Sequence, residues 1–88
     1  MKRVVKVEEV EGEGLVALLG KVVTLLCMNY FYTGELIGVN DTFVLLKNPK
    51  IVYETGPFNE KNWKDAQALP NDELYVMVHA IESFGVIK

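Results

Sequence analysis

The segment from Val22 to Asn48 constrains the fold more than any other part of the chain. It contains three short β-favouring runs, which read VVTLLCM, YFYTGELIGV and TFVLLKN. The runs are separated by Asn29 and by the pair Asn40-Asp41, whose side chains can bond to their own backbone and close turns. Runs spaced this closely predict an antiparallel meander, and a meander this apolar must curl or find partners for its edges.

Two glycines, Gly34 and Gly38, interrupt the alternation within the second run. A glycine inside a strand marks a bulge, a sharp bend or the close approach of another backbone. This pair therefore predicts a strand that bends at the corner of a small barrel. Pro49 cannot donate to a β-ladder, so it bends or ends the third strand or lies on its edge, and we expect the strand to resume over residues 51–54.

The segments on either side of the meander complete the expected fold. EGLVALLGK predicts one or two turns of helix over Leu15 to Leu19, with Gly20 just past its end. ELYVMVHAIESFGVIK predicts two strands, joined by a tight turn that begins at His79. The predicted fold class is all-β with a short N-terminal helix, in which five antiparallel strands form a strongly bent, open, SH3-like barrel. Residues 1–13 are interpreted as an N-terminal arm or an edge strand.

Residues 55–72 are the least regular part of the sequence. They lie between Gly56-Pro57 and Pro70-Asn71-Asp72 and contain NEKNWKDAQAL, where a short helix would present Trp63, Ala66 and Leu69 on one side. One interpretation is a surface loop in which Trp63 covers part of the apolar surface. The other is a loop that contacts a partner protein, because ordered loops of this length tend to be functional.

Composition limits the classes of function. The chain of 88 residues is long enough for one domain, 1–88, and half of its residues are hydrophobic (50%), which favours oligomerisation because a small core cannot absorb so much apolar surface. The net charge of −3 argues against strong, non-specific binding of nucleic acid, which uses a basic patch.

The reactive side chains are too few for a catalytic or metal centre. Cys27 is the only cysteine and His79 the only histidine, so neither a disulfide, a multi-cysteine metal site nor a triad is expected. We therefore predict that the protein is not an enzyme and has no cofactor. The sequence contains no apolar run of signal-peptide or membrane-span length, which predicts a cytoplasmic protein without membrane partners.

The order of these elements resembles the Sm-like family (Sm, LSm and Hfq), and the bacterial branch, Hfq, is most similar. Gly34-Glu35-Leu36, followed by a turn that contains an aspartate and by Leu45-Leu46-Lys47-Asn48, resembles the first motif of Hfq. Met77-Val78-His79-Ala80-Ile81 resembles the second motif of Hfq. On this resemblance the chain divides into the arm 1–13, the helix and first motif 14–54, a variable loop 55–72 and the second motif 73–88.

The resemblance implies a homo-oligomeric ring that binds single-stranded RNA near its central pore. Members of the family hold bases with residues of two turns. The residues at and beside the corresponding turns of this sequence are the candidate RNA-binding residues, namely Asn40, Asp41, Thr42, Phe43 and His79. The strand after the bend pairs with the last strand of the next subunit. The candidate subunit interface is accordingly formed by Ile51, Val52, Tyr53, Phe84 and Val86.

The sequence also departs from the family at the expected RNA site. Asn40 stands where the family has its turn aspartate, and Asp41-Thr42 stands where Hfq has a glutamine and a phenylalanine for reading a base. Val78 replaces the basic pore residue. Two functions therefore stay open: an RNA-binding ring in RNA processing or regulation, and an oligomeric structural or assembly protein with protein partners and no RNA.

Overall fold

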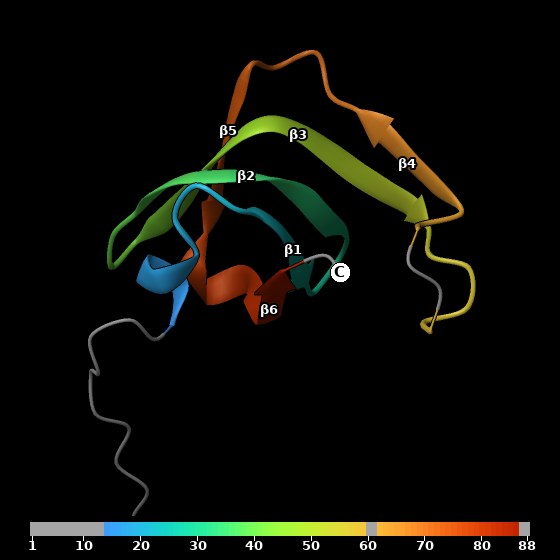
Figure 1. Ribbon diagram of the computed structural model, residues 1–88, viewed down its shortest axis with the longest axis horizontal. Coiled ribbons are helices and arrows are strands. Elements are labelled where there is room, and N and C mark those ends of the chain that lie inside the picture. Colours follow the sequence, from blue (N-terminus) through green and yellow to red (C-terminus); the bar gives the residue numbers. More distant parts are fainter. Residues whose placement is uncertain (1–13, 60–61, 87–88) are drawn as a thin grey trace, which may run out of the picture.

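The computed structural model describes residues 14–59 and 62–86 (Figure 1). These residues form one antiparallel sheet of six strands and two short 3-10 helices, so the prediction of an all-β antiparallel fold is confirmed. The predicted arm or edge strand over 1–13 lies outside the described residues. In chain order the elements are η1 (Leu15–Leu18), β1 (Val22–Cys27), β2 (Phe31–Val39), β3 (Phe43–Glu54), β4 (Asp65–Ala68), β5 (Glu73–Met77), η2 (Val78–Ala80) and β6 (Ile81–Val86).

The short N-terminal helix is present as the single turn η1. It is a 3-10 helix rather than an α-helix, and Gly20 follows it with a φ of 86°. That left-handed conformation is the one in which glycine ends a helix without steric cost. The backbone N–H of Gly20 then donates to the carbonyl of Leu36 on β2, which fixes the helix against the meander.

The meander of β1, β2 and β3 is the centre of the sheet, as its sequence predicts. β1 pairs with β2 from Val22↔Glu35 to Leu26↔Phe31, and β2 pairs with β3 from Phe31↔Val52 to Val39↔Val44. The full strand order is β4-β3-β2-β1-β6, and β5 also pairs with β3. The sheet is not closed, because β5 and β6 do not pair with each other.

The two glycines of β2 coincide with irregularities in its pairing with β3. The register shifts between Thr33 and Glu35 and again between Leu36 and Gly38. β3 continues through Pro49 as one strand instead of stopping there, and Asn48 takes a positive φ of 52° at the shift. The chain thereby absorbs the proline at an irregularity without interrupting the strand.

The stretch predicted to be irregular or helical contains the sixth strand, β4. β4 pairs with the second half of β3, from Lys50↔Ala68 to Glu54↔Asp65, while β5 pairs with the first half, from Lys47↔Glu73 to Phe43↔Met77. The expectation of a short helix presenting Trp63, Ala66 and Leu69 is therefore wrong. An isolated short helix is marginal, whereas the open side of β3 supplies a full set of backbone partners.

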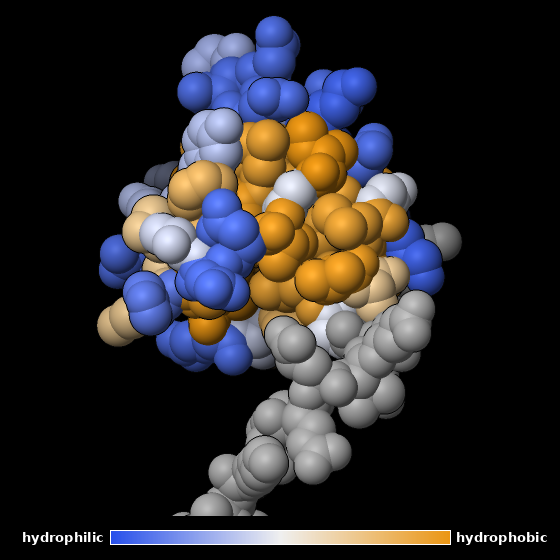
Figure 2. Space-filling model, turned by 90° about the vertical axis from the view of Figure 1, so that its left-hand side faces the viewer, coloured by the Kyte–Doolittle hydropathy of each residue, from blue (hydrophilic) through white to orange (hydrophobic). Residues whose placement is uncertain are grey.

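The described residues form one hydrophobic core. It is built by seven buried side chains of β1, β2, β3 and β5, which are Val23, Leu25, Cys27, Leu36, Val44, Leu46 and Val76. Partly buried side chains of η1 and η2 pack against this core. Figure 2 shows apolar side chains at the surface on the η1 side of the molecule. Among the described residues there is no helix with the length and apolar character to span a membrane.

Candidate functional site

The two turns that the sequence nominates for RNA lie next to each other. The backbone N–H of Val78, at the start of η2, donates to the carbonyl of Thr42 at 2.9 Å. The cause is the pairing of β3 with β5, which ends at Phe43↔Met77 and so places the turn before β3 beside the turn after β5. Residues about 35 positions apart in sequence thus form one continuous surface.

Asn40 shapes the first of these turns through its own side chain. Its Oδ1 atom accepts the backbone N–H groups of Thr42 at 2.8 Å and of Phe43 at 2.9 Å. An aspartate carboxylate would make the same two bonds, so asparagine and aspartate can form this turn equally well. These two bonds give the Oδ1 atom of Asn40 a role in the structure of the turn, and contact of Asn40 with a base stays a prediction.

Phe43 forms the aromatic part of the site together with Tyr75. Their rings meet edge to face, with centroids 4.7 Å apart and planes at 79°. Phe43 is half-buried, whereas Tyr75 is exposed over 60% of its surface. Tyr75 was not among the sequence-based candidates, because only the β3–β5 register places it beside Phe43.

Asp41, Thr42 and His79 are exposed at the tips of the two turns. Neither turn contains lysine or arginine, since they read Asn40-Asp41-Thr42 and Val78-His79-Ala80. The Asp41 carboxylate would repel a phosphate group instead of attracting it. The surface can therefore offer hydrogen bonds and aromatic faces, but its own residues supply little attraction for a polyanion.

The residues nominated for a subunit interface have two different positions. Ile51 and Val52 lie within β3, where their backbone pairs with both β2 and β4, so no third strand can pair there. Phe84 and Val86 are exposed on β6, which pairs with β1 on one side only within the described sheet. The other open edges of the described sheet belong to β4 and β5, and not to residues 51–53 of β3.

An apolar groove follows β5. It has a volume of about 320 Å³ and lies between residues 74–77 of β5 and the connection from β1 to β2, with Met28, Tyr30 and Tyr32 among its lining side chains. Met28 and Tyr30 are both exposed. Apolar side chains next to an unpaired strand edge suit the addition of another strand.

Cys27 also lines this groove, but it is buried. Burial raises the pKa of its thiol, and the nearby Glu82 carboxylate raises that pKa further. The pKa of Tyr32 is raised too, first by burial and then by the neighbouring Cys27 and Tyr30. The thiol stays protonated near neutral pH, so it packs as a small apolar group and is a poor nucleophile. No group of three metal-ligating side chains occurs within residues 14–59 and 62–86.

Comparison with the models of known families, with curated proteins and with solved structures gives no match for this chain.

Proposed function

We propose that the chain is an Sm-like, ring-forming protein that binds single-stranded RNA near a central pore, in RNA processing or regulation. The observation that carries the proposal is the hydrogen bond from Val78 N–H to the Thr42 carbonyl, at 2.9 Å. It joins the two turns that the resemblance nominates independently, from motifs far apart in the sequence. The antiparallel pairing of β3 with β5 brings these two turns together, which is the arrangement that the resemblance implies.

The order of the elements supports the finer fold in this proposal. Without β4, a short helix is followed by five strands, and the last strand returns to pair with the first, as β6 does with β1. The register shifts at Gly34 and Gly38 supply the bend. We therefore treat β1, β2, β3, β5 and β6 as a bent Sm-like open barrel and β4 as an addition to it.

Three strands of the described sheet, β4, β5 and β6, are paired on one side only, and the edges of β5 and β6 support the ring. β6 ends the path of paired strands and β5 lies off that path beside β3, so the β5 edge of one subunit can pair with the β6 edge of its neighbour. Such head-to-tail pairing closes into a ring and removes both edges. The apolar groove beside β5 would then receive side chains of β6 such as Phe84.

The chemistry of the two turns defines how RNA would bind. Stacking on Tyr75 or Phe43 contributes about 1–3 kcal/mol per base, while His79 offers a ring for stacking or for a hydrogen bond. Without lysine or arginine in the turns, few counterions are released, so the affinity should depend only weakly on salt. This combination favours contacts with bases over contacts with phosphates.

Fluorescence anisotropy with labelled oligo-U and oligo-A at low salt tests the proposal. We expect saturable binding at micromolar protein, and a loss of about tenfold or more in the variants His79→Ala and Tyr75→Ala, as the removal of a stacked base requires. Phe58→Ala is the matched control, because Phe58 is an exposed aromatic residue outside both turns. Absence of binding, or binding that His79→Ala leaves unchanged, would contradict the proposal.

The second candidate is an oligomeric assembly protein with protein partners and no RNA binding. It is favoured by the net charge of −3 and by the lack of basic residues in the two turns. The two candidates share the ring and differ only in the ligand. A folded oligomer that binds neither oligonucleotide would therefore select the assembly role.

A further inference from the structure

A second hollow lies on the sheet away from the two turns. It is an open pocket of about 560 Å³ that is lined by residues of β2 and β3 and by residues 62–66, the last two of which belong to β4. Its size falls within the range of roughly 300–1,000 Å³ that is usual for small-ligand sites. None of its lining residues belongs to the turns 40–42 and 78–80, so this pocket is separate from the surface proposed for RNA.

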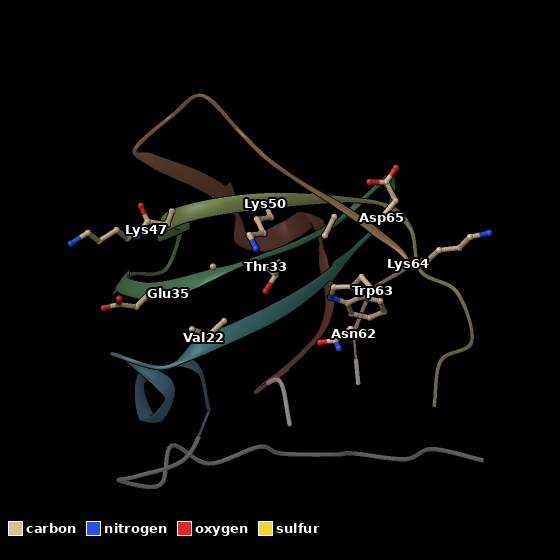
Figure 3. Close-up of a pocket in the computed structure, with 12 residues that line it drawn as sticks. Val22, Thr33, Glu35, Lys47, Lys50, Asn62, Trp63, Lys64 and Asp65 are labelled. Atoms are coloured by element: carbon tan, nitrogen blue, oxygen red, sulfur yellow. The ribbon is translucent and has the colours of Figure 1, made fainter. Parts of the chain in front are cut away.

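Trp63 forms one wall of the pocket and has an unsatisfied donor. Its ring packs edge to face on Phe31, with centroids 6.0 Å apart, which holds the indole in place. Its Nε1 atom is buried and has no hydrogen-bond partner among the described residues. Figure 3 shows this nitrogen on the side of the ring that faces Thr33. A buried donor without a partner costs about 1–3 kcal/mol, a cost that a bound acceptor would remove.

Lys50 supplies the charge that points into the pocket. Figure 3 shows its ammonium group directed toward Thr33, while Lys47 and Glu35 extend away from the hollow on the other side. Lys64 also points outward, and its Nζ atom pairs with Glu54 at 3.1 Å. Five charged residues line the pocket and three of them are lysines, although the whole chain carries a net charge of −3; the five are Glu35, Lys47, Lys50, Lys64 and Asp65.

Thr33 and Val22 complete the surface between these two groups. The Thr33 hydroxyl donates to the carbonyl of Val23 at 2.9 Å, which orients the oxygen and leaves it free to accept a bond. Val22 is half exposed and adds apolar area at the base of the pocket. The pocket thus presents a cation and an N–H donor next to apolar and aromatic surface.

We propose that this pocket binds a small aromatic anion, that is, a ring that bears a phosphate or a carboxylate group. The anionic group accepts from the Lys50 ammonium and from the Trp63 N–H, and the ring lies against Val22 and the Trp63 indole. Lysine binds either anion as a point charge, so the chemistry shared by phosphate and carboxylate defines the class of ligand. This function goes beyond the proposed binding of RNA and does not depend on it.

Trp63 is the only tryptophan and reports on the pocket directly by its fluorescence. The probes are adenosine monophosphate and 4-hydroxyphenylacetate, with adenosine and inorganic phosphate as the two halves of the first probe. We expect one of the aromatic anions to change the emission saturably with a Kd of about 1 mM or tighter, and either half to bind about tenfold more weakly. The proposal is overturned if neither aromatic anion gives a saturable change, or if a half binds as tightly as the whole.

Two lysine variants locate the site. Lys50→Met should weaken binding of the aromatic anion by about tenfold or more, as the loss of a charged hydrogen bond requires. Lys21→Met is the matched control, because Lys21 is an exposed lysine that lines neither pocket; the removal of its charge should leave the Kd unchanged. Equal effects of the two variants would overturn the proposal, since they would indicate a general charge effect.

Trp63→Phe keeps an aromatic ring but removes the N–H donor together with the five-membered ring of the indole. Titration calorimetry, which does not need the indole fluorescence, should record weaker binding in this variant, and circular dichroism should show a retained fold. An unchanged Kd in Trp63→Phe would contradict the assigned donor. Binding that persists in His79→Ala is expected, because the pocket and the RNA surface share no residue.

Discussion

At the level of single residues, two threonines on neighbouring strands differ in one hydrogen bond. Thr24 on β1 and Thr33 on β2 are direct cross-strand partners, and both are buried. The Thr33 hydroxyl donates to the Val23 carbonyl at 2.9 Å, whereas the Thr24 Oγ1 atom is buried without a partner among the described residues. A buried hydroxyl contributes only when it is bonded, so the same residue type has opposite effects at these two sites.

Replacement of each threonine by valine tests this difference. Valine keeps the branched shape and removes the hydroxyl, so Thr24→Val should raise the free energy of unfolding by about 1 kcal/mol and Thr33→Val should lower it by about 1 kcal/mol. Urea denaturation at one fixed protein concentration measures both values. A Thr24→Val protein less stable than Thr33→Val would show that the Thr24 hydroxyl has a partner in solution.

At the level of elements, β2 depends on close contact with β3 at Gly34. A Cβ atom at Gly34 would lie 3.1 Å from the Lys47 carbonyl oxygen and 3.3 Å from the Pro49 Cα atom. Both neighbours belong to the β3 backbone, which cannot move as the end of a side chain can. Gly34 is therefore required by space, at the point where the pairing of β2 with β3 changes register.

We expect Gly34→Ala to lower the free energy of unfolding by about 1–3 kcal/mol, the usual effect of overpacking in a tight interior. Gly85→Ala is the matched control, because Gly85 also lies within a strand but has no atom within 4 Å of a new Cβ. That control should be neutral or stabilising by up to about 1 kcal/mol, since alanine loses less conformational entropy than glycine on folding. Similar stability of the two variants in urea would contradict the role given to Gly34.

At the level of the whole molecule, the open edges of β5 and β6 dominate the expected behaviour. Phe84 and Val86 on β6 and Tyr75 and Met77 on β5 expose apolar surface beside these edges. A monomer with two such edges would associate irregularly. Regular pairing of one edge with the other in a ring removes both edges at once.

Native mass spectrometry of the wild type should therefore show one closed oligomer, and Phe84→Glu should shift it to monomer by placing a charge on the pairing edge. Burial of an uncompensated carboxylate costs several kcal/mol for each interface, enough to dissociate it. Phe58→Glu introduces the same charge at an exposed phenylalanine outside the strands and should leave the oligomer intact. A monomeric wild type would remove the basis for the ring.

The local signals in the sequence were sufficient for the centre of the fold. Turn-forming Asn40, helix-ending Gly20 and the apolar alternation each act within a few residues, so the meander, η1 and the two motif turns could be predicted from them. The prediction failed at β4, whose sequence DAQA has low β-propensity. Its conformation is imposed by backbone bonds to β3, which no local pattern reveals.

Cross-strand register explains why the candidate sites could be predicted only in part. The sequence placed Thr42 and His79 in turns, but the β3–β5 pairing decided that these turns touch and that Tyr75 meets Phe43. The pocket of Trp63 and Lys50 likewise exists only because β4 returns the chain across β3. By itself, the sequence determined the meander, its turns and the side chains available to them. The tertiary structure decided which side chains meet, because hydrogen-bonded partners in a sheet are set by the register between strands distant in sequence.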